Sequence, residues 1–218
     1  MIKLVNFLLF VKNITTYSKR DIDKGKTPLE IYKLCSCIRE TFCLSYSIRN
    51  YNNLYLYFQN EHLLIQFKGE KLKYLGPDER SQALLLKKAI DIANQYKSLI
   101  YKEWIKSTPG IFVRGFKDNN NFYAFLKSIL TGNYYLIVDS NQYSREEYDF
   151  LIFSNETLGK LSELLFIMPT YAISKDNSDV IELFEKLKNI KYGNLSKIEG
   201  AENKILYINF QIDQQIYI

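Results

Sequence analysis

Short apolar runs that alternate with amphipathic helical patterns limit the possible folds of this chain most strongly. In the second half, such runs lie at Tyr134–Val138, Phe150–Phe153 and Leu165–Met168, with helical patterns at Leu158–Leu164 and Asp179–Ile190. Strands that alternate with helices are joined by crossover connections, and these connections produce a parallel sheet. The sequence therefore predicts an α/β fold in which helices flank a parallel sheet.

The first half contains the same two kinds of element. Apolar runs predict strands at Val5–Val11, Leu54–Phe58 and Leu63–Phe67, and periodic patterns predict helices at Pro28–Tyr46, Glu79–Leu99 and Phe122–Leu130. The polar stretch Thr15–Thr27 predicts a loop whose last residue caps the helix that follows, with Pro28 as its first helical residue. Lys204–Ile218, rich in Ile and Tyr, predicts one or two further strands.

Apolar residues at a spacing of three to four predict the buried faces of the two longer helices. These faces are Ile31, Leu34, Cys35, Ile38 and Phe42 in the first, and Ala83, Leu86, Ala89, Ile90 and Ala93 in the second. Cys35 and Cys37 cannot both face the core from one side of a helix. Cys35 is therefore expected to be a small core residue rather than a metal ligand.

Composition excludes several classes of protein. Of 218 residues, 47% are hydrophobic and 24% are charged, which is ordinary for a globular domain. No apolar run reaches the roughly 18 residues that a membrane span needs, and the N-terminus lacks the features of a signal peptide, so we expect a cytoplasmic protein without membrane contact. Three cysteines and one histidine make neither a disulfide framework nor a metal site, and they argue against nucleophilic catalysis that depends on histidine.

Charge is distributed unevenly along the chain. Residues 1–130 hold 21 Lys and Arg against 11 Asp and Glu, whereas residues 131–218 hold 8 against 13. A basic first part beside an acidic second part indicates a phosphate-binding surface on the first part. An ordinary surface charge distribution accounts for the same balance equally well.

The segment Gly76-Pro77-Asp78-Glu79-Arg80 permits two interpretations. Asp78 and Glu79 suit the start of a helix, where the helix dipole favours acidic side chains. Alternatively, Asp78 faces a cleft as a proton acceptor and Arg80 holds a phosphate.

Ligands of parallel α/β sheets bind outside the carboxyl ends of the strands. This rule points to Asp139–Gln142, Ser154–Gly159 and Pro169–Ser174. The chain has no glycine-rich dinucleotide fingerprint and no phosphate-binding loop ending in Gly-Lys-Ser/Thr, so neither of those two nucleotide sites is expected.

Several segments, in this order, resemble one family. They are Leu34-Cys35-Ser36-Cys37, Leu44-Ser45 with Ile48-Arg49, Ile65–Gly69, Gly76–Arg80, Leu85–Ala89, and Trp104 followed by Ser107–Arg114. The chain resembles the archaeal tRNA pseudouridine-54 N1-methyltransferases of the SPOUT class. The resemblance is specific over about residues 5–115 and extends by pattern to about 190. It implies a SPOUT domain over residues 1–190, a C-terminal strand extension over 191–218, a trefoil knot near the C-terminus, and a homodimer.

The resemblance also implies roles for individual residues. Asp78 would act beside the target base, and Arg49, Arg80 and Arg114 would hold tRNA phosphates. S-adenosylmethionine would be bound by Leu136, Ser154, Gly159, Met168, Pro169, Thr170, Tyr171, Ala172, Ile173 and Asp179. In this register Phe150–Phe153 is the second cofactor strand; in an alternative register Leu165–Met168 is the second strand, with Pro169-Thr170-Tyr171 as its loop.

The implied activity is methyl transfer from S-adenosylmethionine to N1 of pseudouridine in the tRNA T-loop, without a metal. The second and third cofactor loops depart from the family pattern, because Ser154–Gly159 has few glycines and Asp179 falls near a position where the family has Cys. These departures leave two alternatives open. One is a SPOUT-fold RNA-binding or scaffold protein without catalysis, and the other is a methyltransferase acting on a different RNA.

Overall fold

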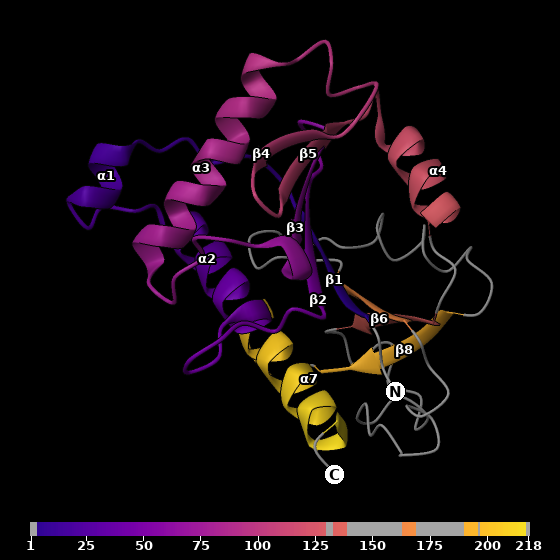
Figure 1. The fold of residues 1–218 in the computed structure, drawn as a ribbon. Coiled ribbons are helices and arrows are strands. Elements are labelled where there is room, and N and C mark those ends of the chain that lie inside the picture. The colour runs from indigo at the N-terminus through magenta and orange to yellow at the C-terminus, as the bar shows by residue number, and fades with distance from the viewer. Residues whose placement is uncertain (1–3, 130–132, 139–162, 169–189, 196, 217–218) are drawn as a thin grey trace.

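A computed structural model of the chain describes residues 4–129, 133–138, 163–168, 190–195 and 197–216 (Figure 1). These residues form an eight-stranded sheet of order β4-β5-β3-β2-β1-β7-β6-β8 with helices on both faces. The fold is thus α/β, as expected. Among the described residues, no helix is long and apolar enough to cross a membrane.

The strands divide into a parallel part and an antiparallel part. β1, β2, β6, β7 and β8 run in one direction, and β3, β5 and β4 extend the sheet beyond β2 as antiparallel neighbours. The bounds are β1 Leu4–Val11, β2 Asn52–Phe58, β3 Leu63–Lys68, β4 Ile105–Thr108, β5 Ile111–Gly115, β6 Asn133–Val138, β7 Glu163–Met168 and β8 Ile190–Asn194. The predicted parallel sheet is therefore confirmed for five of the eight described strands, whereas β3, β5 and β4 make the sheet mixed. β8 is a strand that the sequence did not predict.

Each face of the sheet has its own helical layer and its own core. Alternate residues of β1 point to opposite faces, so that Phe7 joins the core under α2, α3 and α7 while Phe10 joins the core under α4. In the second core, the rings of Tyr57 and Phe122 stack with centroids 3.5 Å apart. The helices are α1 Lys19–Asp23, α2 Leu29–Phe42, α3 Glu79–Gln95, α4 Asn119–Ile129 and α7 Ala201–Ile216, with a 3₁₀ turn η1 at Gly69–Lys71.

The N-terminal connections differ in detail from the prediction. The stretch predicted as a loop contains α1, because Ser18 and Asp21 form a reciprocal capping box that starts a helix. Pro28 itself is the N-cap of α2, without a side-chain cap bond, so Thr27 does not cap it. The helix ends at Phe42 rather than Tyr46, since Cys43 is extended and pairs with Ile48 across a tight loop.

The C-terminal segment is a helix, and the prediction of strands over Lys204–Ile218 is wrong. Ile205, Ile208 and Ile212 recur at a spacing of three to four residues and are fully buried. This helical period outweighs the strand preference of Ile and Tyr because one face of the helix packs on α2. β8 and α7 therefore belong to the same sheet and core as the rest of the chain, rather than to a separate strand extension.

The same helix explains a second discrepancy. Cys35 and Cys37 are both buried, although we expected only Cys35 to be. α2 packs on β2, on α3 and on α7, so more than one of its sides is covered. Burial raises the pKa of Cys37, and Glu202 of α7 raises it further, which places this thiol on the α7 side.

Several predicted elements lie wholly or partly outside the described residues. They are the strand Phe150–Phe153, most of the helix Leu158–Leu164 and most of the helix Asp179–Ile190. At the ends of those two helices, Glu163 begins β7 and Ile190 begins β8. The knot would depend on how residues 139–162 and 169–189 pass one another, so it stays a prediction.

Candidate active site

The expected site residues lie at two opposite edges of the parallel sheet. We call the edge where β1, β2, β6, β7 and β8 begin the amino edge, and the edge where they end the carboxyl edge. Asp78 belongs to the amino edge because it lies in the connection that follows the end of β3. At that end, the backbone N–H of Gly69 donates to Oδ1 of Asn53, at the start of β2, at 3.3 Å. The strands that carry Leu136 and Met168 end at the other edge. Strands of this length separate the two edges by about 20 Å.

At the amino edge, Asp78 is the N-cap of α3. Its Oδ1 accepts a hydrogen bond of 2.8 Å from the backbone N–H of Ser81, which confirms the capping interpretation. The residue is exposed, and this bond engages one carboxylate oxygen only. Capping and proton transfer are therefore compatible, because the second oxygen is left to accept a proton.

Gly76 holds the Asp78 carboxylate in a tight frame. The N–H of Gly76 donates to Oγ of Ser81 at 2.7 Å, and its carbonyl accepts from Nε2 of Gln82 at 3.1 Å. A Cβ on Gly76 would lie 2.5 Å from Oδ2 of Asp78, closer than real Cβ contacts allow. The glycine thus provides the space in which the free oxygen of Asp78 sits.

Arg80 lies in the first turn of α3 and is exposed. Its Nε and Nη2 lie 3.0 and 2.9 Å from Oδ1 of Asp23 in α1, and its side chain is 57% exposed. Exposed ion pairs of this kind contribute little to stability. Arg80 is therefore free to exchange Asp23 for a phosphate.

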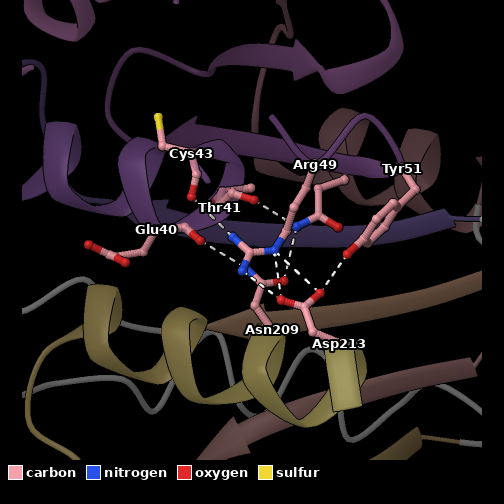
Figure 2. Close-up of polar contacts among 8 residues, drawn as sticks. Glu40, Thr41, Cys43, Arg49, Tyr51, Asn209 and Asp213 are labelled. Carbon is pink, nitrogen blue, oxygen red and sulfur yellow. Dashed lines mark hydrogen bonds and ion pairs between the residues drawn. The ribbon is translucent and has the colours of Figure 1, made fainter. Parts of the chain in front are cut away.

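Arg49 was expected to hold a tRNA phosphate, but its side chain is engaged within the protein (Figure 2). Its side chain is only 7% exposed, and its Nη2 lies 2.7 Å from Oδ2 of Asp213 near the end of α7. Its Nη1 donates to the carbonyl of Cys43, and the hydroxyl of Tyr51 donates to the same Asp213 at 2.6 Å. Arg49 thus anchors α7 to the start of β2, and its buried charge is already matched.

Amide side chains continue this anchor toward α2. Nδ2 of Asn52 donates to the carbonyl of Thr41 and to Oδ1 of Asn209, and Nδ2 of Asn209 donates to the carbonyl of Glu40 (Figure 2). Asn52 and Asn209 are fully buried. Both Nδ2 groups are paired, although Oδ1 of Asn52 is buried without a partner among the described residues. Because an unpaired buried donor costs free energy, these bonds fix the position of α7 against α2.

Arg114 lies on the opposite face of the sheet from Arg80. It pairs in register with Leu64 of the α4-side core, and its guanidinium sits 4.6 Å from the ring centroid of Phe125. Phe116 and Trp104 lie 5.6 and 6.0 Å away. The three expected phosphate ligands are therefore dispersed, since Arg49 is buried in the α7 anchor and Arg114 is half-buried among aromatic rings.

The turn Ser107–Gly110 is hydrogen-bonded to the loop that leads to Asp78 at the amino edge. Gly110 has φ of +82°, and a Cβ there would meet the backbone N of Leu72 at 2.5 Å. The N–H of Lys68 donates to the Gly110 carbonyl at 2.7 Å, and that of Lys73 donates to the Pro109 carbonyl at 3.4 Å. This turn therefore holds the loop that leads to Asp78, which gives the Pro-Gly pair a structural role.

At the carboxyl edge, the neighbouring parallel strands β7, β6 and β8 end together. β7 lies between β1 and β6, and β8 lies on the far side of β6, with Val138 paired to Asn194. Leu136 and Met168 are buried in the core, so any cofactor contact they make there would use backbone groups. The sequence analysis missed β8 and the loop that follows it, although Gly193-Asn194 after an alternating run is a recognisable strand end.

The other expected cofactor residues lie outside the described residues. They are Ser154, Gly159, Pro169, Thr170, Tyr171, Ala172, Ile173 and Asp179. The described part of the edge has an apolar floor, with Leu195 only 2% exposed and Gly193 buried. Apolar surroundings with backbone groups at strand ends are typical of small-molecule sites. No group of three His, Cys, Asp or Glu side chains suited to a metal ion occurs among the described residues.

Comparisons with known proteins identify the family of the chain. A model of the family described as "Putative SAM-dependent RNA methyltransferase" matches residues 5–142. Among curated tRNA (pseudouridine(54)-N(1))-methyltransferases, that of Methanocaldococcus jannaschii is 41% identical over 90 residues, or 39% of this chain and 44% of the relative. That of Methanococcoides burtonii is 26% identical over 97% of this chain and 96% of the relative. That of Methanococcus vannielii is 30% identical over 68% of this chain and 69% of the relative.

The family model covers the strands and loops that build the amino edge. The family model includes Asp78, Gly76 and Arg80 and spans more than half of the chain. The chain therefore belongs to this family of RNA methyltransferases.

Proposed function

We propose that this protein methylates N1 of pseudouridine 54 in the T-loop of tRNA, with S-adenosylmethionine as methyl donor. The relatives bear the name of this activity, and one of them matches almost the whole chain. The observation that carries the proposal is the Asp78 carboxylate, which is exposed, fixed by a cap bond and left with one oxygen to accept a proton. The cytoplasmic location expected from the sequence is part of this proposal.

Asp78 would act on the N1–H of pseudouridine. Uridine has its glycosidic bond at N1, whereas pseudouridine carries a proton there that must leave for N1 to be methylated. S-adenosylmethionine, when bound, supplies an electrophilic methyl group. Asp78, directly or through a water that it orients, would accept the proton, and such help typically accelerates a reaction by roughly 10²–10⁴-fold.

A second copy of the chain is needed to complete such a site. Asp78 lies at the amino edge and the proposed cofactor strands end at the carboxyl edge, about 20 Å away in the same chain. We therefore propose a homodimer of the SPOUT type in which Asp78 of one copy faces the carboxyl edge of the other. The outer face of α7 supports an interface between copies, since Leu206 and Phe210, four residues apart, are 44% and 54% exposed.

The test is calorimetric titration with S-adenosylmethionine, followed by a methyl-transfer assay. We expect micromolar binding, about −8 kcal/mol, and transfer to tRNA that contains pseudouridine 54. A transcript with uridine at this position is the matched control, because it has no N1 proton and should not react. Binding without any transfer to either RNA would contradict the proposed substrate.

A non-catalytic RNA-binding protein is the second candidate function. The altered loop Ser154–Gly159 favours it, because a side chain where a ligand closely approaches glycine can block that ligand. This candidate predicts tRNA binding with no heat of S-adenosylmethionine binding at millimolar ligand, so the same titration separates the two functions.

A further inference from the structure

Two tyrosines beside Asp78 are almost fully exposed. Tyr46 is 102% exposed and Tyr74 is 79% exposed, the two largest exposures among the large hydrophobic residues that the structure describes. A tyrosine ring that is not buried gains nothing from the hydrophobic effect. Their presence at one edge therefore needs a reason other than packing.

The backbone of Tyr74 strengthens this point. Its φ is +68°, in the left-handed region that a bulky side chain rarely adopts and glycine adopts freely. The chain thus has a strained residue with its ring in solvent, where glycine would give the same turn without strain. Backbone strain of this kind is concentrated at functional sites, which indicates that the exposed tyrosine ring has a function at this position.

Tyr46 is carried by an equally well-defined loop. Cys43 pairs with Ile48, and the N–H of Leu44 donates to the carbonyl of Ser47 at 2.9 Å, so Tyr46 lies at the tip of a tight turn. The loops of Tyr46 and Tyr74 meet where the thiol of Cys43 lies 3.8 Å from the carbonyl of Gly76. Both rings are therefore attached to the frame that also fixes Asp78.

Basic side chains lie in the same loop as Tyr74 and at the helix start that follows it. Lys71, Lys73 and Arg80 are exposed in the same loop and helix start. Glu70 is engaged by Lys68 at 3.0 Å and lies 3.9 Å from Lys71. Exposed aromatic rings interspersed with lysine and arginine are how proteins bind unpaired RNA, since bases stack on the rings and phosphates meet the cations.

We propose that Tyr46 and Tyr74 stack on unpaired bases of the RNA substrate and hold the loop that contains the target base against Asp78. This inference rests on the proposed function for the identity of the RNA, and it adds the surface that receives it. A second copy of the chain is the competing occupant of this surface, and the test below distinguishes the two.

The test is binding of a T-arm hairpin RNA containing pseudouridine, measured without S-adenosylmethionine by fluorescence anisotropy. Tyr46→Ala and Tyr74→Gly should each weaken hairpin binding by about fivefold to a hundredfold, the range of one lost stacking contact. Tyr74→Phe should retain the affinity of the unaltered protein. Tyr32→Ala, a change to a half-exposed tyrosine of α2, is the matched control and should have no effect.

Two further readouts separate binding from structure. Tyr74→Gly removes the strain, so its melting temperature should stay equal or rise while hairpin affinity falls. A fully paired RNA duplex of the same length should bind all variants alike, because it offers no free bases to stack.

Three results would overturn the inference: unchanged hairpin affinity in both variants, no hairpin binding by the unaltered protein, or dissociation of a dimer in sedimentation as the main effect of either change. Failure of methyl transfer alone would overturn the proposed function and leave this surface intact.

Discussion

The amino edge and the carboxyl edge of the sheet are built in different ways. The amino edge is a cross-linked polar frame in which Gly76, Asp78, Ser81 and Gln82 hold one another through hydrogen bonds. The described part of the carboxyl edge is an apolar floor of strand ends with buried Leu136 and Met168. A polar frame suits a group that must point at an RNA base, and an apolar floor suits a bound cofactor. This difference supports the proposal that one chain carries two half-sites rather than one complete site.

Substitution of Asp78 should have the largest effect on the methyl-transfer rate. Asp78→Asn should lower the methyl-transfer rate by roughly 10²–10⁴-fold, because the amide cannot accept the proton. Asn caps helices as well as Asp does, so the melting temperature should hardly change. Single-turnover kinetics with pseudouridine-containing tRNA measure the rate, and anisotropy measures affinity. An equal loss of rate and affinity would show that Asp78 binds RNA rather than accepts a proton.

Two ion-paired arginines of the amino edge, Arg49 and Arg80, should respond differently to loss of their partners. Asp213→Ala leaves the buried charge of Arg49 unpaired, so we expect a loss of about 3 kcal/mol in the free energy of unfolding. Asp23→Ala removes the exposed partner of Arg80 and should cost less than about 1 kcal/mol. Urea titrations of both variants compare the two pairs. Similar losses would mean that Arg49 is not a structural anchor.

Substitution of Gly76 tests how precisely the Asp78 carboxylate must be positioned. In Gly76→Ala the new Cβ displaces the Asp78 carboxylate, whose side chain can move cheaply. The rate should therefore fall by about tenfold, as expected for a small misplacement of a reacting group. The urea midpoint should stay close to that of the unaltered protein. Gly25→Ala is the control for activity: φ of +64° makes it strained, which should lower the urea midpoint, but no atom lies within 4 Å of the added Cβ, so the rate should not change.

Mixing two inactive variants tests whether each active site is formed by two copies of the chain. Asp78→Ala is combined with Gly193→Glu, a variant that calorimetry should show to be unable to bind S-adenosylmethionine. If each site uses two copies, half of a random mixture is heterodimer with one intact site, and about one quarter of full activity returns. Thr170→Glu replaces the second partner if Gly193→Glu does not fold. An inactive mixture, with exchange of copies verified by mass, would mean that one chain holds the whole site.

Local signals in the sequence predict much of this fold. The Pro77-Asp78-Glu79 segment gave the correct start of α3 because capping depends only on nearby residues. The buried faces of α2 and α3 follow from helical periodicity and are confirmed. For the site, the same local logic correctly placed Asp78 at a helix start.

What the sequence did not yield depends on distant partners. Cys37 is buried because α7 covers a second side of α2, and this cover comes from residues more than 160 positions away. Arg49 resembles a phosphate ligand by type, yet its role is decided by Asp213, 164 residues further on. The prediction of strands in place of α7 failed because Ile and Tyr content was weighed above their spacing. A heptad count over Ile205, Ile208 and Ile212 would have found the helix.

The seating of α7 has a consequence for synthesis on the ribosome. The partners Glu40 and Asn209 are 169 residues apart, and chains grow at about 5–20 residues per second, so roughly 8–34 s pass between their appearance. During that time the side of α2 that carries Cys37 has no cover, and the charge of Arg49 has no counterion. The nascent chain thus exposes an apolar strip with a free thiol until its last helix emerges, and a chaperone that shields this strip would raise the yield of native protein.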